Sequence, residues 1–263
     1  MEVVCNEVVR PITEMAACGG GRAPDGLCGA LYGALVMCPE RAEEIKAAFA
    51  MSAILTIEGP AGFGFDPGLL EDLYNVGFRI TSLGWNEQNI LTGSHITGGC
   101  LTELGKAYVR EAQRLGMLVD VSHISDEGFW DIMDITQGPV IATHSNSRSV
   151  CNVSRNLTDD MFRAICSTNG VVGMNLYGAF IGAEPTLDAL CDHIFHFLEM
   201  DPDCKHIALG GDLDGCDQLC GSVNGIQDYP LIADRLAERG LSEEMIRNIF
   251  WNNAMEVFRK CST

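Results

Sequence analysis

Four residues that can bind a metal ion or move a proton each come directly after a short apolar run. Glu58 follows AILTI and His123 follows VDVS. His144 follows IAT and Asp212 follows ALGG. In a parallel α/β barrel the carboxyl ends of the strands meet at one face, where the active site is built. Imidazole and carboxylate ligands suit zinc, so these residues predict a divalent-metal site if the apolar runs are strands of such a barrel.

The remaining histidines and one loop arginine have competing interpretations. His193 and His196 lie three residues apart in DHIFHFLEM, which has no HExxH pattern and fits a helix packed outside the strands. His95 and His206 fit loop or strand-start positions. Arg155, in CNVSRN, is either solvated surface or a clamp that binds a substrate carboxylate through two parallel hydrogen bonds.

The elements that must position these side chains alternate between helix and strand from about residue 39. Ser125 and Thr158 are good helix N-caps, and a helix is also expected over residues 39–50, after Pro39. Six apolar runs predict strands, with 246–253 as a candidate seventh; the six are 53–57, 78–83, 117–123, 140–144, 171–177 and 206–215. Strands separated by helical segments indicate βαβ units and a parallel sheet.

The expected fold class is therefore α/β, and the number of strands fits a (β/α)8 TIM-type barrel better than a doubly wound sheet. We expect one domain over residues 1–263, a length that such barrels commonly use. Residues 1–40 are an atypical segment, rich in glycine and alanine, so the first strand of a barrel is poorly represented.

The composition limits the partners and the compartment. The net charge of −19 argues against binding to nucleic acid, which requires a basic surface. No run of apolar residues is long enough for a membrane span, and the first residues do not read as a signal peptide. The 12 cysteines include no CxxC pair, which favours reduced thiols and a cytoplasmic location.

Seven stretches of the chain together carry a family resemblance: TIEG, LGWNEQN, LTELGKAYVREAQRLGMLVDVSHISD, PVIATHSNSRSVCNVSRNLTDDM, VVGMNLY, IALGGDLDG and FWNNAMEVF. With these stretches the chain resembles the membrane dipeptidase (renal dipeptidase) family of zinc metallopeptidases. The resemblance runs in the family's order over about residues 50–258.

The resemblance implies a (β/α)8 barrel with two zinc ions that hydrolyses dipeptides. It implies that Glu58 bridges the metals, and that His123 and His144 complete one of the two metal sites. It also implies that Arg155 holds the terminal carboxylate of the substrate and that Asp212 moves protons beside the attacking water. A small dipeptide is the expected partner, and a homodimer stays open.

The chain departs from the family pattern in two places. The His-x-Asp pair that supplies ligands to the other metal is missing, because no histidine precedes His95. Trp85 stands where some members have a histidine. One zinc per chain is therefore an alternative to two. A catalytically impaired barrel of the same family, or a related metal-dependent amide hydrolase, is the alternative to an active dipeptidase.

Overall fold

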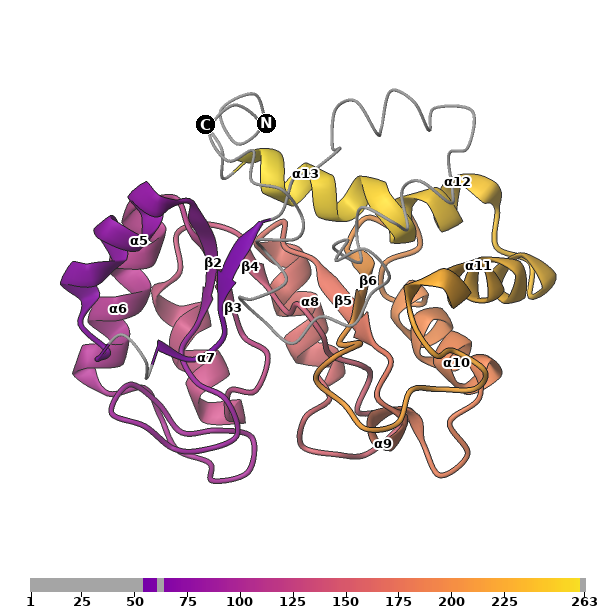
Figure 1. Cartoon of the computed structure of the whole chain (residues 1–263), viewed down its shortest axis with the longest axis horizontal. Helices are drawn as coiled ribbons and strands as arrows, with labels where there is room; N and C mark the ends of the chain where they lie inside the picture. Colours follow the sequence, from indigo (N-terminus) through magenta and orange to yellow (C-terminus); the bar gives the residue numbers. More distant parts are fainter. Residues whose placement is uncertain (1–53, 61–63, 261–263) are drawn as a thin grey trace.

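The computed structural model describes residues 54–60 and 64–260, which form parallel strands alternating with helices (Figure 1). Four strands pair in parallel and in chain order: β1 (Leu55–Ile57), β2 (Phe78–Ser82), β3 (Leu118–Asp120) and β4 (Val140–Ile141). Strands β5 (Val172–Asn175) and β6 (Ile207–Gly211) form a second parallel pair. A parallel bridge between Ala142 and Val172 joins the two sheets, so the six strands follow one another in space as in the sequence.

Five of the described α-helices begin at a serine or threonine whose side chain caps the first turn. The hydroxyl of Ser125 accepts a hydrogen bond from the backbone N–H of Gly128, and Thr158 does the same for Met161. Such caps satisfy N–H groups that the first turn leaves open. The α-helices are α5 (Leu70–Val76), α6 (Glu103–Arg114), α7 (Asp126–Ile135), α8 (Asp159–Ser167), α9 (Gly178–Ile181), α10 (Leu187–Leu198), α11 (Tyr229–Glu238), α12 (Glu243–Arg247) and α13 (Asn253–Lys260).

Three shorter helical turns complete the described elements. They are the 3₁₀ turns η4 (Pro67–Leu69) and η5 (Ile226–Asp228) and the π-helical turn η6 (Asn248–Asn252). Among the described residues, no helix combines the length and the apolar character needed to cross a membrane.

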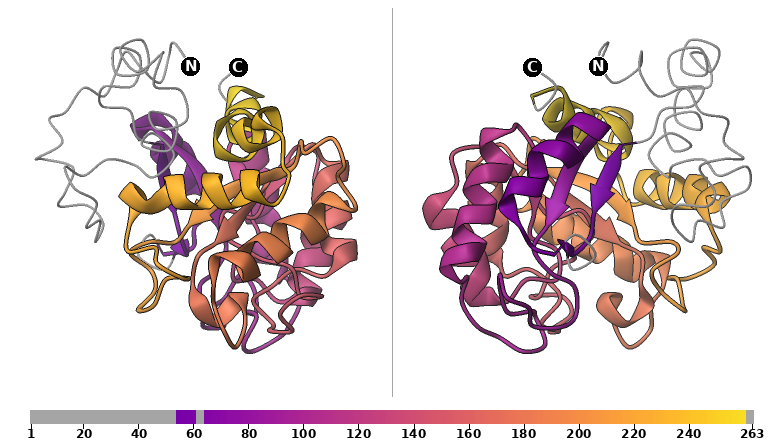
Figure 2. Two further views of the ribbon diagram at one scale, coloured as in Figure 1. Left: turned by 90° about the vertical axis from the view of Figure 1, so that its right-hand side faces the viewer. Right: turned by 60° about the vertical axis from the view of Figure 1, so that its left-hand side comes forward.

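The central strands β3, β4 and β5 are buried on both faces. On one face they pack against the helices, where Phe162 of α8 and Phe197 of α10 stack at a ring distance of 4.1 Å. On the other face one residue from, or next to, each of β2 to β6 joins a cluster with Val257 of α13. Figures 1 and 2 show α13 lying across the sheet beside these strands. A cluster that includes a residue from, or next to, each of five successive strands indicates that the sheet curves around it.

Two glycines allow the strands next to the site to approach closely. A Cβ atom on Gly173 of β5 would lie 2.1 Å from the carbonyl oxygen of Thr143, and one on Gly210 of β6 would lie 2.0 Å from the same atom. Both distances are far inside van der Waals contact, so only glycine fits at either position without movement of the backbone.

The structure confirms the α/β class and all six expected strands, which are shorter than their apolar runs. The candidate seventh strand over 246–253 is wrong, because this segment is helical from α12 through η6 into α13. Ile246, Ile249 and Phe250 are buried at a helical spacing, and Ser242 caps the first turn. The expected helix over 39–50 and the atypical segment 1–40 lie outside the described residues.

Candidate metal centre and active site

Three of the predicted site residues meet at the carboxyl ends of neighbouring strands. Glu58 directly follows β1, and His123 and His144 follow β3 and β4. Oε1 of Glu58 lies 3.1 Å from Nε2 of His123 and 3.3 Å from Nε2 of His144. The two Nε2 atoms are 2.9 Å apart. Both histidines are buried, whereas the Glu58 side chain is 48% exposed, so the cluster is open on its carboxylate side.

The donor set fits a metal ion. One oxygen and two ring nitrogens lie within 4.8 Å of one another. Ligands about 2.0 Å from a tetrahedral zinc ion are about 3.3 Å from each other, which is close to the spacing seen here. The contacts of Glu58 with His123 and His144 hold the pKa of Glu58 well below its usual range. Burial lowers the pKa of His123, which favours the neutral imidazole that a metal binds.

Each histidine is oriented through its other ring nitrogen. Nδ1 of His123 lies 3.0 Å from Oδ1 of Asn86, in the loop after β2. Nδ1 of His144 lies 2.7 Å from the hydroxyl of Thr143, which in turn donates to Oδ2 of Asp120 at 2.5 Å. With Nδ1 held by an oxygen, each ring directs Nε2 toward the metal site.

His95 also lies beside the site, although its sequence position indicated only a loop or the start of a strand. Its ring centroid is 6.0 Å from that of His123, and its Nε2 lies 3.2 Å from the Asn86 oxygen that also contacts His123. Nδ1 of His95 contacts the hydroxyl of Ser154 at 3.0 Å. Burial lowers the pKa of His95 to about 4, so the ring is neutral at pH 7.

Arg155 is a buried cation with free donors. The residue is only 4% exposed, and Nη1 donates to the hydroxyl of Ser145 at 2.7 Å. Nε and Nη2 are buried and find no hydrogen-bond partner in the described part of the chain. Burial lowers the pKa of Arg155 to about 10, against the opposing effect of the carboxylates of Asp120, Asp212 and Glu58. Two unmatched N–H donors beside a metal site suit a carboxylate ligand.

Asp212 directly follows β6 in a left-handed backbone conformation, with φ of 57°. Its Oδ2 accepts a hydrogen bond from Nδ2 of Asn175 at 3.1 Å. His123 has the same kind of backbone, with φ of 72°. Asp and His tolerate this region better than most residues, but the conformation still carries strain of a kind that gathers at functional sites.

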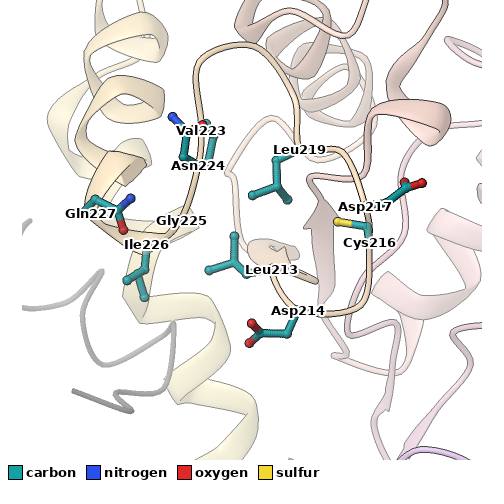
Figure 3. Close-up of a pocket in the computed structure, with 10 residues that line it drawn as sticks. All are labelled: Leu213, Asp214, Cys216, Asp217, Leu219, Val223, Asn224, Gly225, Ile226 and Gln227. Atoms are coloured by element: carbon teal, nitrogen blue, oxygen red, sulfur yellow. The ribbon is translucent and has the colours of Figure 1, made fainter. Parts of the chain in front are cut away.

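A cavity of about 390 Å³ opens in the loop that follows Asp212 (Figure 3). The carboxylates of Asp214 and Asp217 line it, together with Cys216. Because this lining is acidic, the cavity is a poor site for an anionic group, unlike the surroundings of Arg155. Trp85, which is 54% exposed, lies beside the centre, with its ring 6.2 Å from that of His123.

The other histidines lie outside the centre. The buried His193 contacts the backbone N–H of Ser147 and the carbonyl of Ile181. His196 pairs with Asp159 at 2.8 Å. His206 contacts a backbone carbonyl. All three have structural partners, as expected for residues without a ligand role.

The structure thus brings Glu58, His123 and His144 into direct contact and places Arg155 within electrostatic reach of Glu58 and Asp212. Sequence reasoning missed Asn86, His95, Asp120 and Thr143. Asp120 did leave a signal, because it is a lone acid within an apolar strand.

The chain is similar to known dipeptidases. Residues 32–263 match the sequence profile of the membrane dipeptidase family, peptidase family M19. An uncharacterized dipeptidase of Schizosaccharomyces pombe is 33% identical over 216 residues, which are 80% of this chain and 53% of that protein. An uncharacterized protein from the pqqA 5′ region of Klebsiella pneumoniae is 32% identical over 237 residues, 84% of each chain. The chain spans about half the length of the fission yeast relative.

The chain is also similar to a solved metallopeptidase structure. The metallopeptidase of Rhodobacter sphaeroides, liganded with a phosphinate mimic of the dipeptide L-Ala-D-Ala, is 26% identical. The match has a TM-score of 0.76 and covers 83% of this chain and 67% of that one. With the strand-end cluster of one carboxylate and two imidazoles, these findings establish that the chain belongs to the membrane dipeptidase family, peptidase family M19.

Proposed function

We propose that this chain is a zinc-dependent dipeptidase. The observation that carries the proposal is the combination of a three-ligand cluster with a buried arginine whose Nε and Nη2 have no partner among the described residues. A metal cluster alone is compatible with many hydrolases. The free donors of Arg155 add a binding site for a carboxylate, which every dipeptide carries at one end.

Each residue of the site has a role in this reaction. Glu58, His123 and His144 would hold zinc, which supplies an activated water and polarises the peptide carbonyl. Arg155 binds the terminal carboxylate of the substrate through Nε and Nη2 and thereby fixes the peptide bond relative to the cluster. Asp212 carries the proton to the leaving amine, and the hydrogen bond from Asn175 to Oδ2 orients its carboxyl group.

The proposed number of zinc ions at this cluster is one per chain. This number follows from the described residues, of which Glu58, His123 and His144 form one three-ligand cluster. The family resemblance implies a second zinc ion, with Glu58 between the two.

We further propose that the six parallel strands belong to an eight-stranded (β/α)8 barrel. Strand order follows chain order, and residues of β2 to β6 converge on Val257. Both features are expected of a closed parallel barrel and not of a doubly wound sheet, in which the strand order reverses.

Metal analysis and hydrolysis together test the function. The purified protein is dialysed against zinc, its zinc content is measured, and L-Ala-L-Ala and L-Ala-D-Ala are offered as substrates. We expect one tightly bound zinc ion and turnover of at least one dipeptide. His144→Ala should lose both, whereas the matched control His196→Ala, a histidine that contacts Asp159 instead, should keep both.

The alternatives give different results. Zinc binding without turnover of any amide would indicate an inactive member of the family. Hydrolysis of other small amides but not of dipeptides would indicate a related amide hydrolase. Full zinc content in His144→Ala would show that the metal binds elsewhere.

A further inference from the structure

The two histidines of the metal centre are supported by groups of different charge. The Nδ1 partner of His123 is the neutral amide oxygen of Asn86. The Nδ1 partner of His144 is the Thr143 hydroxyl, which leads on to the carboxylate of Asp120. Only the hydrogen-bonded series that starts at His144 therefore ends on an anion.

Asp120 is positioned as an acceptor on both of its oxygens. It is the last residue of β3 and is only 5% exposed. Oδ1 accepts from the backbone N–H groups of Ser122 and Thr143, both at 2.9 Å. Oδ2 accepts from the Thr143 hydroxyl. The Thr143 hydroxyl lies 2.5 Å from Oδ2 and 3.3 Å from the hydroxyl of Ser122, so the anionic Oδ2 is the stronger acceptor for its hydrogen.

We propose that Asp120 is a positioning residue, which acts through Thr143 to keep the imidazole of His144 in the tautomer that binds metal. This inference rests on the proposed metal site at Glu58, His123 and His144, and it concerns how that site is prepared.

The proton positions follow from the donors and acceptors. Thr143 donates its single hydroxyl hydrogen to Oδ2 of Asp120, so toward His144 its oxygen offers a lone pair. Nδ1 of His144 must then carry a hydrogen and donate it to Thr143. In a neutral imidazole with a hydrogen on Nδ1, Nε2 has the free lone pair, and this atom faces Glu58 and His123.

Isosteric replacement of the carboxylate would disturb this order. In Asp120→Asn, the amide oxygen would stay with the two backbone N–H groups, and the NH₂ group would face Thr143 as a donor. The hydroxyl hydrogen would lose its acceptor at Asp120 and become free to point at Nδ1 of His144. The hydrogen of the ring would then move to Nε2, where it blocks the metal.

The test measures zinc affinity by competition with a chelator in the wild type, Asp120→Asn, Thr143→Val and Thr143→Ser. We expect affinity to fall about 10- to 100-fold in the first two variants, the range typical of lost partners of metal-bound histidines. Thr143→Ser keeps the hydroxyl and should bind zinc as the wild type does. A merely structural role of the Thr143 methyl group would not be rescued in this way.

The matched control is Thr81→Val, which removes a buried hydroxyl bonded to Tyr108 at 2.8 Å, away from the histidines. It should lose stability without losing zinc affinity. Tautomers are read independently in the metal-free protein from ¹H–¹⁵N correlations of the His144 ring, with the hydrogen on Nδ1 in the wild type and on Nε2 in Asp120→Asn.

The outcomes separate this inference from the proposed function. A wild type that binds no zinc contradicts the proposed function. If the wild type binds zinc and Thr143→Val binds it equally tightly, the positioning role of Asp120 through Thr143 is contradicted. If Asp120→Asn does not fold, the Val and Ser variants of Thr143 still decide the question.

Discussion

Replacement of Arg155 by methionine should stabilise the metal-free protein and at the same time abolish its activity. Arg155 is a buried cation with one hydrogen bond, to Ser145, and two donors without a partner in the described region. Methionine is long, apolar and flexible, so it can fill the same space without a charge.

The gain in stability follows from the pKa of the guanidinium. Burial lowers it from an ordinary value of about 12.5 to about 10. At about 1.4 kcal/mol per tenfold change in proton affinity, burial disfavours the charged form by about 3 kcal/mol. The lost hydrogen bond to Ser145 costs about 1 kcal/mol. The net gain of about 2 kcal/mol corresponds to a rise in Tm of roughly 4–8 °C for a domain of this size.

Thermodynamic linkage between proton binding and folding gives the pH range in which buried Arg155 lowers stability. The pKa of this base is lower in the folded protein, so the unfolded chain holds the proton more tightly. The penalty is therefore fully present at pH 7 and disappears only above the unfolded pKa. The control Arg148→Met should have the opposite effect and lower Tm, because Arg148 is paired with Asp126 through two hydrogen bonds of 2.6 and 2.8 Å.

Activity should change in the other direction. Loss of two hydrogen bonds between charged groups, at about 1.5–3 kcal/mol each, lowers kcat/KM for a dipeptide by at least about 100-fold. The C-terminal amide of the same dipeptide has no carboxylate, so wild type and Arg155→Met should hydrolyse it equally slowly. Calorimetry of the metal-free proteins measures Tm, and initial rates with both substrates give kcat/KM. A fall in Tm for Arg155→Met would refute the assignment of an unsatisfied buried charge, and an unchanged kcat/KM would refute the carboxylate clamp.

Two further predictions concern Asp212 and Tyr108. Asp212→Asn should lower kcat about 10²- to 10⁴-fold with zinc content unchanged. A kcat within threefold of the wild type in steady-state assays would contradict a role of Asp212 in proton transfer. Burial raises the pKa of Tyr108 to about 12, so the folded protein keeps a proton that the unfolded chain loses above about pH 10. Stability should therefore fall between these values, by about 1.4 kcal/mol at pH 11. Urea unfolding of Tyr108→Phe should lack this loss, and equal pH dependence in both proteins would contradict the burial effect.

The strands and most helices could be predicted from the sequence because their signals are local. Apolar runs marked the six strands, and Ser125 and Thr158 capped the helices that the pattern placed after them. The error over 246–253 has a physical reason. Ile246, Ile249 and Phe250 look like an apolar run when read in order, but three- and four-residue spacing buries all three on one face of a helix.

Glu58, His123, His144 and Asp212 could be placed from the sequence because the carboxyl ends of parallel strands share one face. Asn86, His95 and Thr143 could not, because their roles arise from contacts between loops and strands that are distant in the chain. Asn86 reaches His123 across 37 positions, and Asp120 reaches Thr143 across 23.

The energetic costs of this fold gather at the same strand ends. Arg155 buries a charge with free donors, Asp120 buries a carboxylate at the end of a core strand, and His123 and Asp212 hold left-handed backbone. A buried charge costs several kcal/mol unless its partners compensate, and the strained conformations add to that cost. Apolar residues in these places would give a more stable fold but would remove the groups proposed to bind metal and a substrate carboxylate. Such costs gather around the cluster of Glu58, His123 and His144, as is expected of a catalytic centre. We therefore expect substitutions that relieve them to raise stability and to lower the proposed activity.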